Sequence, residues 1–151
     1  MKTLAATRDK SEIRLRLEGL TPTQERLWGK MTVHGMVCHL ADAFRLPLGE
    51  KHASPLRPPL PRGLYKWAAL RLPTKWPKGV PTRPEMEQGA GGTVPTDFDA
   101  DRKDLFLLIE RFTTTLATEI PPHPIFGRMT REEWLRWGYL HVDHHLRQFG
   151  A

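Results

Sequence analysis

The sequence contains a single cysteine, Cys38, among its 151 residues, so a disulfide bond within the chain is impossible. One thiol is typical of a protein in a reducing compartment, and we expect a cytoplasmic location. No run of about 18 apolar residues is present, so no membrane-spanning helix is expected. The amino-terminal residues lack the apolar core and cleavage pattern of a signal peptide. The length and the hydrophobic fraction of 39% predict one globular domain spanning residues 1–151.

Acidic residues are missing from one long segment. Between Lys51 and Pro84 there are eight basic residues and no acidic one, which leaves fifteen basic against seventeen acidic residues elsewhere. The net charge of +6 therefore belongs to this segment, and nucleic acid is not expected as a partner of the whole protein. Tyr65, Trp67 and Trp76 interleave with the charges, as aromatic residues do in single-stranded nucleic-acid grooves. The alternatives are a loop over an anionic ligand, a membrane-surface helix, or a loop anchored by its aromatic residues, and we favour the last.

Apolar spacing and capping residues predict an all-α fold with four main helices. These are expected from Arg8 to Leu20, from Thr32 to Leu46, from Asp97 or Asp99 to Leu116, and from Thr130 to Phe149. The last opens with Thr130-Arg131-Glu132-Glu133, which is a capping box. Residues 48–95 contain nine prolines, so little regular structure is expected there except a short amphipathic helix from Gly63 to Leu72. Connections of this length tend to be functional or crossover segments.

Two histidines in the last helix have the spacing of a metal-ligand pair. His141 and His145 are four residues apart, which places their side chains one above the other on a helix, with about 5–6 Å between Cβ atoms. Two imidazoles at that distance can reach one metal ion. Helical geometry puts both at the edge of the apolar stripe, whereas Asp143 and His144 are expected on the polar face. Asp143 and His144 are therefore poor ligand candidates.

A third histidine occupies an equivalent position in the second helix. His39 lies at the edge of the apolar stripe of that helix, whereas His34 is expected on the opposite, polar side. Gly35 and Ala43 bracket His39, and Gly138 lies close to His141 in the last helix. Small residues at these positions are expected to leave room for a bound group. The competing interpretation is that the three are ordinary histidines at the edge of a core.

The segments around these histidines resemble a known superfamily. Residues 36–42 (MVCHLAD) and 141–148 (HVDHHLRQ) are similar to the two signatures of the DinB-like superfamily. Residues 28–31, 75–79, 123–127 and the ending 147–150 resemble an uncharacterised branch of it, so the resemblance spans nearly the whole chain. It implies a four-helix bundle in which His39, His141 and His145 bind a divalent metal. Some members of the superfamily transfer or act upon low-molecular-weight thiols, and bundles of this type often pair, which allows a homodimer.

Three histidine ligands leave a coordination position open, which is more typical of a catalytic than of a structural site. We expect a divalent ion, with zinc, nickel and iron all compatible with imidazole ligands. Gln148 and Asp42 are candidates to orient the ligands, Asp42 by accepting the second ring proton of His39. His123, in a loop, either covers the site or packs within the loop, and Cys38 is expected to be a packing residue.

The leading functional hypothesis is a metal-dependent enzyme, either a hydrolase or a thiol-linked transferase, acting on a small molecule that is anionic or contains a thiol. The alternative is a non-enzymatic module that is stabilised by a metal or that binds nucleic acid or an anionic ligand. No nucleophile or catalytic residue can be assigned from the sequence.

Overall fold

The computed structural model describes residues 1–115 and 120–151, and it confirms the predicted all-α class. The described residues form five α-helices, one short 3-10 turn and no strand. The elements are α1 (Thr7–Glu18), α2 (Val33–Arg45), α3 (Arg62–Arg71), η1 (Pro84–Met86), α4 (Phe98–Thr115) and α5 (Arg131–Gln148). Each predicted helix, including the short one at α3, is present within a few residues of its expected bounds. Leu116, the predicted last residue of the third helix, lies outside the described residues.

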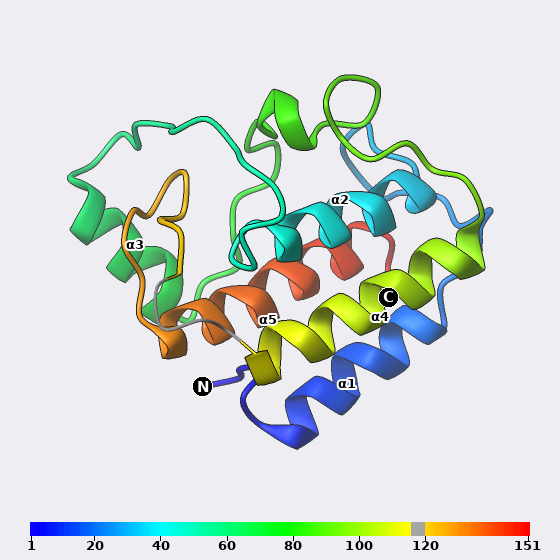
Figure 1. The fold of residues 1–151 in the computed structure, drawn as a ribbon, viewed down its shortest axis with the longest axis horizontal. Coiled ribbons are helices and arrows are strands. Elements are labelled where there is room, and N and C mark those ends of the chain that lie inside the picture. Colours follow the sequence, from blue (N-terminus) through cyan, green and yellow to red (C-terminus); the bar gives the residue numbers. More distant parts are fainter. Residues whose placement is uncertain (116–119) are drawn as a thin grey trace.

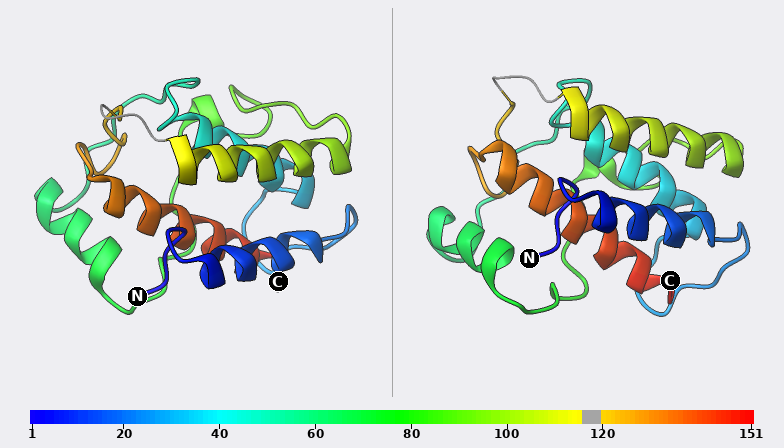
Figure 2. Two further views of the ribbon diagram at one scale, coloured as in Figure 1. Left: turned by 60° about the horizontal axis from the view of Figure 1, so that its bottom comes forward. Right: turned by 90° about the horizontal axis from the view of Figure 1, so that it is seen from below.

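Helix α2 is the centre of the molecule. Every residue from Val33 to Phe44 except His34 is buried, because α2 packs against both α4 and α5 while α1 covers another side of α5 (Figure 1, Figure 2). The ring of Phe44 lies 5.0 Å from that of Phe112 and 6.2 Å from that of Trp137. These contacts join α2, α4 and α5 into one apolar core.

The helices that carry the candidate ligands begin at well-formed caps. Thr32 accepts a hydrogen bond from the Gly35 backbone N–H at the start of α2, at 3.0 Å. Thr130 and Glu133 form the predicted capping box at the start of α5. Caps of this kind satisfy backbone donors that have no partner inside the helix. They therefore fix where each helix starts and which residues face the core.

The connection between α2 and α4 lies along one side of α2, with α3 at one end of the molecule (Figure 1). It is largely irregular, as predicted, and several contacts tie it down. The Tyr65 ring packs 5.9 Å from the Phe126 ring, the Trp76 ring lies 6.2 Å from the His141 ring of α5, and Lys66 pairs with Glu133. Tyr65 and Trp76 thus anchor the connection, as favoured from the sequence, whereas Trp67 is 54% exposed.

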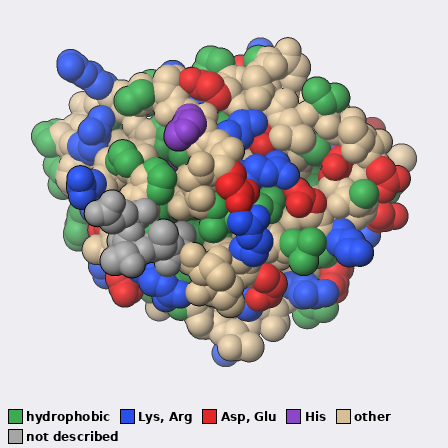
Figure 3. All heavy atoms as spheres, viewed as in Figure 1, with side chains coloured by type: hydrophobic (Ala, Val, Ile, Leu, Met, Phe, Trp, Pro, Cys, Tyr) green, Lys and Arg blue, Asp and Glu red, His purple; other side chains and the backbone are tan. Residues whose placement is uncertain are grey.

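Charge is unevenly spread over the face seen in Figure 3. Basic side chains gather with hydrophobic ones toward the end of the molecule that holds α3, and elsewhere on this face basic and acidic side chains intermingle. This face therefore carries no continuous basic stripe of the kind that tracks a nucleic-acid backbone. In the part of the chain that the structure describes, no helix combines the length and apolar character needed to cross a membrane.

Candidate metal centre

The structure brings the three predicted histidines together. His39 comes from α2 and His141 and His145 from α5, and one nitrogen of each lies within 4.8 Å of those of the other two. Nε2 of His39 and Nε2 of His141 lie 3.3 Å apart. Two nitrogens that bind one zinc ion at about 2.05 Å with a tetrahedral angle lie about 3.3 Å apart. The donor atoms of this pair already have the separation that a tetrahedral ion requires.

Hydrogen bonds fix the tautomers of two of the three imidazoles. His39 Nδ1 lies 3.1 Å from the carbonyl oxygen of Met86, which is only an acceptor, so this nitrogen carries the ring proton. His145 Nδ1 lies 3.0 Å from Oε1 of Gln148, whose Nε2 donates to the Trp28 carbonyl at 2.9 Å. His145 is therefore also protonated on Nδ1. Both Nε2 atoms present lone pairs, which is how histidine binds a metal.

Burial keeps the three imidazoles neutral. It lowers the pKa of His39 despite the hydrogen bond to Met86, and it lowers the pKa values of His141 and His145 well below the ordinary value. Mutual repulsion among the three rings acts in the same direction. Nδ1 of His141 is buried and has no hydrogen-bond partner among the described residues, whereas its Nε2 lies 3.3 Å from the unprotonated Nε2 of His39, so without an ion the ring proton of His141 is on Nε2. Neutral imidazoles in a buried cluster suit a divalent cation.

Gln148 lies against a candidate ligand and Asp42 does not. The side chain of Asp42 accepts hydrogen bonds from Lys51 at 2.7 Å and from the Thr93 backbone N–H at 2.8 Å, and it pairs with Arg45. The expectation that Asp42 accepts the second ring proton of His39 is wrong, because the Met86 carbonyl takes that position. Asp42 instead ties the long connection to α2.

The small residues near the histidines serve packing and not ligand space. A Cβ atom on Gly35 would lie 2.1 Å from Oε1 of Gln88, so that side chain already fills the space. A Cβ atom on Gly138 would lie 2.8 Å from Leu4 Cδ1 and 3.0 Å from a ring carbon of Phe112, inside the core. The expectation that these glycines leave room for a bound group is therefore wrong. The room lies on another side of the histidines.

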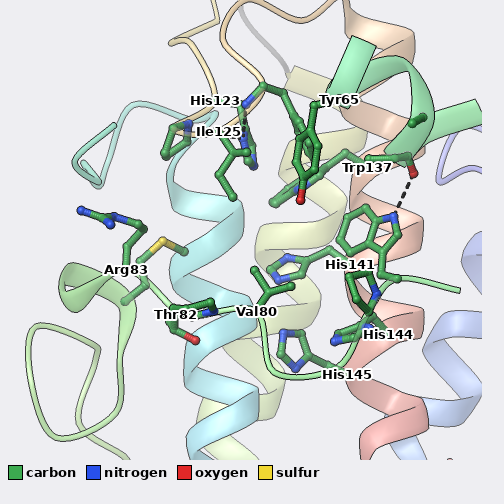
Figure 4. Close-up of a pocket in the computed structure, with 18 of the residues that line it drawn as sticks. Tyr65, Val80, Thr82, Arg83, His123, Ile125, Trp137, His141, His144 and His145 are labelled. Atoms are coloured by element: carbon green, nitrogen blue, oxygen red, sulfur yellow. Dashed lines mark hydrogen bonds between the residues drawn. The ribbon is translucent and has the colours of Figure 1, made fainter. Parts of the chain in front are cut away.

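That room is a cavity of about 370 Å³, which all three histidines line. Its other walls come from the long connection, from α3 and from the 123–127 turn, and they are mostly apolar (Figure 4). Leu60, Leu72 and Val80 are lining residues that are also exposed, so the cavity reaches the surface. The volume is in the range of small-molecule sites. Sequence reasoning missed this cavity, because most of its walls belong to segments without periodicity.

Two further histidines line the same cavity. His144 was expected on the polar face, but its ring lies 6.2 Å from that of Trp76 and 5.3 Å from that of His145. The expectation fails because the long connection covers this face of α5, a contact that helical periodicity cannot reveal. Asp143 does lie apart from the cavity, paired with Arg16 and Arg147. His123 both packs within its loop and lines the cavity.

A second group of potential ligands lies between α2 and α4. His34, Cys38 and Asp101 each offer one atom, all within 4.8 Å of one another. His34 is therefore not on a free polar face, since its Nε2 lies 2.7 Å from Asp101. Burial and the Asp101 carboxylate raise the pKa of Cys38 to about 12, so this thiol is protonated. Asp101 also accepts from the Thr96 backbone N–H. These contacts are those of a tie between two helices.

A family model matches the larger, carboxy-terminal part of the chain. The family model described as "Protein of unknown function (DUF1569)" matches residues 60–151. The chain belongs to this family. The DUF1569 match includes α3, α4 and α5, and so contains His123, His141 and His145, whereas α2 and His39 precede it. No curated protein and no solved structure shows a significant match to the chain.

Proposed function

We propose that this DUF1569 protein is a metal-dependent enzyme of the DinB-like type, in which His39, His141 and His145 hold one divalent ion. The hydrogen-bonded Nδ1 atoms of His39 and His145 support this proposal most strongly, because they leave two Nε2 lone pairs in a buried group of three histidines. An ordinary core histidine needs no such arrangement. The packing of α1, α2, α4 and α5 agrees with the four-helix bundle that the sequence resemblance implies.

The cavity favours a catalytic over a purely structural ion. Three imidazoles are one ligand short of a closed tetrahedral site, and the three histidines line a cavity that reaches the surface. Zinc, nickel and iron all suit imidazole ligands. When bound, such an ion supplies Lewis acidity, which lowers the pKa of a coordinated water or polarises a substrate atom.

The residues of the chain itself would hold and orient the reacting groups. Gln148 keeps the ring of His145 in one orientation, and the Met86 carbonyl does the same for His39. The apolar walls exclude water from the substrate, which strengthens every polar interaction inside the cavity. Hydrolysis and transfer to or from a thiol are the two reaction classes that we propose, both on a small molecule that enters from the cavity mouth.

Metal binding by single-residue variants tests this proposal. We expect about one ion per chain in the wild type after dialysis against zinc, and loss of that ion in His39→Ala, His141→Ala and His145→Ala, measured by elemental analysis. His34→Ala is the matched control, since His34 lies on α2 near His39 but outside the group. It should keep the ion. Full retention of the ion by the three variants would overturn the proposal.

A second measurement separates an enzyme from a metal-stabilised module. A structural ion contributes several kcal/mol to folding, so chelation would lower the melting temperature strongly. The core of this protein forms from apolar contacts among α1, α2, α4 and α5, so we expect the metal-free protein to remain folded. Collapse of the fold on chelation would favour the structural alternative.

A further inference from the structure

His123 is a buried imidazole that does not belong to the three-histidine group. It lies in the turn before α5, where the backbone groups of His123 and Gly127 form two hydrogen bonds of 2.9 Å. Its Nδ1 accepts the backbone N–H groups of Ile125 at 3.1 Å and Phe126 at 3.2 Å. A ring nitrogen that accepts two N–H groups carries no proton, so the proton of the neutral ring is on Nε2.

The surroundings of His123 leave its Nε2–H available to a molecule in the cavity. One face of the ring stacks on Phe126 at 4.6 Å, and the rings of Trp134 and Trp137 lie 5.4 and 5.3 Å away. The side chain is 8% exposed and lines the cavity, and no described residue accepts a hydrogen bond from its Nε2. Burial lowers the pKa of His123 to about 3, so the ring stays a neutral donor at physiological pH.

His123 is separated from the three-histidine group by one indole. The Trp137 ring lies 5.3 Å from the His123 ring and 4.9 Å from the His141 ring (Figure 4). Tyr65 and Trp76 supply further ring surfaces on other walls. Flat aromatic walls around a cavity of about 370 Å³ suit an apolar body that itself contains a ring.

The charges around the cavity are of one sign. Lys75 and Arg83 are lining residues, and no carboxylate is found among the described residues that line it. The guanidinium of Arg83 donates to Ser54 Oγ and lies near the carboxylate of Glu85, whereas Lys75 pairs with no carboxylate in the described part of the chain. A lining cation with no carboxylate beside it favours an anionic oxygen group on whatever binds.

We propose that the cavity binds a small molecule with a ring-bearing apolar body and an anionic oxygen group, as in aromatic carboxylates, and that His123 Nε2 donates a hydrogen bond to it. The proposal rests on the proposed function for the role of the cavity as a substrate site. It does not require the ion, because His123, the aromatic walls and Lys75 are present without it.

Binding of aromatic acids to the metal-free, full-length protein tests this. The probes are 1-naphthylacetate, 2-naphthoate and 4-phenylbutyrate, and the readout is the fluorescence of the tryptophans, two of which line the cavity. We expect at least one probe to bind with a Kd below about 1 mM, and 1-naphthylacetamide to bind more weakly than the acetate. Absence of binding by all three acids would overturn the proposal.

Two substitutions at His123 distinguish the acceptor role of Nδ1 from the donor role of Nε2. In His123→Asn the side-chain oxygen can replace Nδ1 as the acceptor for Ile125 and Phe126, but the Nε2 donor is lost, and we expect about tenfold weaker binding of the acid. His123→Gln places an N–H near the former Nε2 and should recover part of the affinity. His52→Asn, an exposed position outside the cavity, is the control and should bind as the wild type does. Equal affinity of His123→Asn and wild type would overturn the role of His123.

A measurement on the wild type covers the case in which the variants misfold. The imidazole ¹⁵N resonances of His123 should show the Nε2-protonated tautomer, and the Nε2 signal should shift on addition of the acid. An Nδ1-protonated ring would contradict the proposal. Because these experiments are done without metal, failure of ligand binding and failure of the metal titration described above are distinguishable.

Discussion

The side-chain amide of Gln148 joins His145 to the backbone of Trp28. Its Oε1 lies 3.0 Å from His145 Nδ1, and its Nε2 donates to the Trp28 carbonyl at 2.9 Å. The second bond settles which end of the amide faces the imidazole, and thereby which nitrogen of His145 is free for an ion. One residue in the last turn of α5 thus sets both the orientation and the tautomer of a candidate ligand.

Removing this acceptor should weaken the metal site without removing a ligand. In Gln148→Leu we expect a loss of zinc affinity of about 10- to 100-fold, as is usual when the group that orients a metal-bound histidine is lost. Gln148→Glu keeps an acceptor for His145 but loses the donor to the Trp28 carbonyl, so it should lose less affinity than Gln148→Leu. Competition titration with a chromogenic chelator measures both variants. Unchanged affinity in Gln148→Leu would show that Gln148 has no orienting role.

The buried carboxylate of Asp42 should be important for stability. Its side chain is 1% exposed and is held by Lys51, Arg45 and Thr93. Breaking such a buried pair costs about 3 kcal/mol or more, so Asp42→Ala should lose that much in urea unfolding. Glu50→Gln breaks a largely exposed pair with Arg111 and serves as the control, with a change within about 0.5 kcal/mol. Similar losses in the two variants would contradict this account.

Acid should weaken the same interaction. Burial alone would raise the pKa of Asp42, but the hydrogen bonds from Lys51 and Thr93 outweigh it and lower the pKa below its ordinary value. A carboxyl whose pKa is lower when folded stabilises the protein above its unfolded pKa, and this contribution is lost as the pH falls through the folded pKa. The free-energy difference between wild type and Asp42→Ala should therefore shrink as the pH falls below about 4.

His123 should make stability depend on pH in a different window. Its pKa is about 3 in the folded protein and near 6.5 when unfolded, so the unfolded chain binds a proton that the folded chain does not. Stability is fully present above about pH 6.5 and falls on acidification toward about pH 3, by at most about 1.4 kcal/mol per pH unit from this residue. The slope in His123→Asn should be shallower by about this amount between about pH 4 and pH 6. Equal slopes would show that His123 titrates normally in the folded state.

Two helical glycines should respond oppositely to the same substitution. A Cβ on Gly138 would approach Leu4, Phe112 and Phe44 at 2.8–3.2 Å, so Gly138→Ala should cost about 1–3 kcal/mol through overpacking. A Cβ on Gly63 in α3 would have no neighbouring atom within 4 Å, so Gly63→Ala should stabilise by about 0.5–1 kcal/mol. Thermal melting of both variants tests the pair. A stabilised Gly138→Ala would mean that the core is looser at this point.

The helices whose apolar residues recur at helical spacing could be predicted from the sequence. Helical spacing and the Thr130 capping box indicate the bounds of α5 and its buried side, and therefore the positions of His141 and His145. The same reasoning places His39 toward the core side of α2. These predictions worked because local sequence decides which residues of a helix share a face.

The contacts made by the long connection could not be predicted. The partner of His39 is the backbone carbonyl of Met86, and a carbonyl has no residue signature. His144 lines the cavity because Trp76 covers that face of α5, and the sequence shows no period that would pair these two residues. The hydrogen-bond partners of Asp42 could not be predicted for the same reason, since Lys51 and Thr93 reach it from irregular segments. Contacts between irregular segments far apart in the chain need three-dimensional information.

X-ray absorption spectroscopy of the zinc-loaded protein tests the central claim most directly. The three-histidine group predicts three imidazole nitrogens at about 2.0–2.1 Å, one further light atom and no sulfur. The competing group of His34, Cys38 and Asp101 would instead give one zinc–sulfur distance of about 2.3 Å. Scattering from three imidazole nitrogens in the wild type, and its loss together with the ion in His141→Ala, would support the account. A sulfur ligand, or an ion without imidazole scattering, would contradict it.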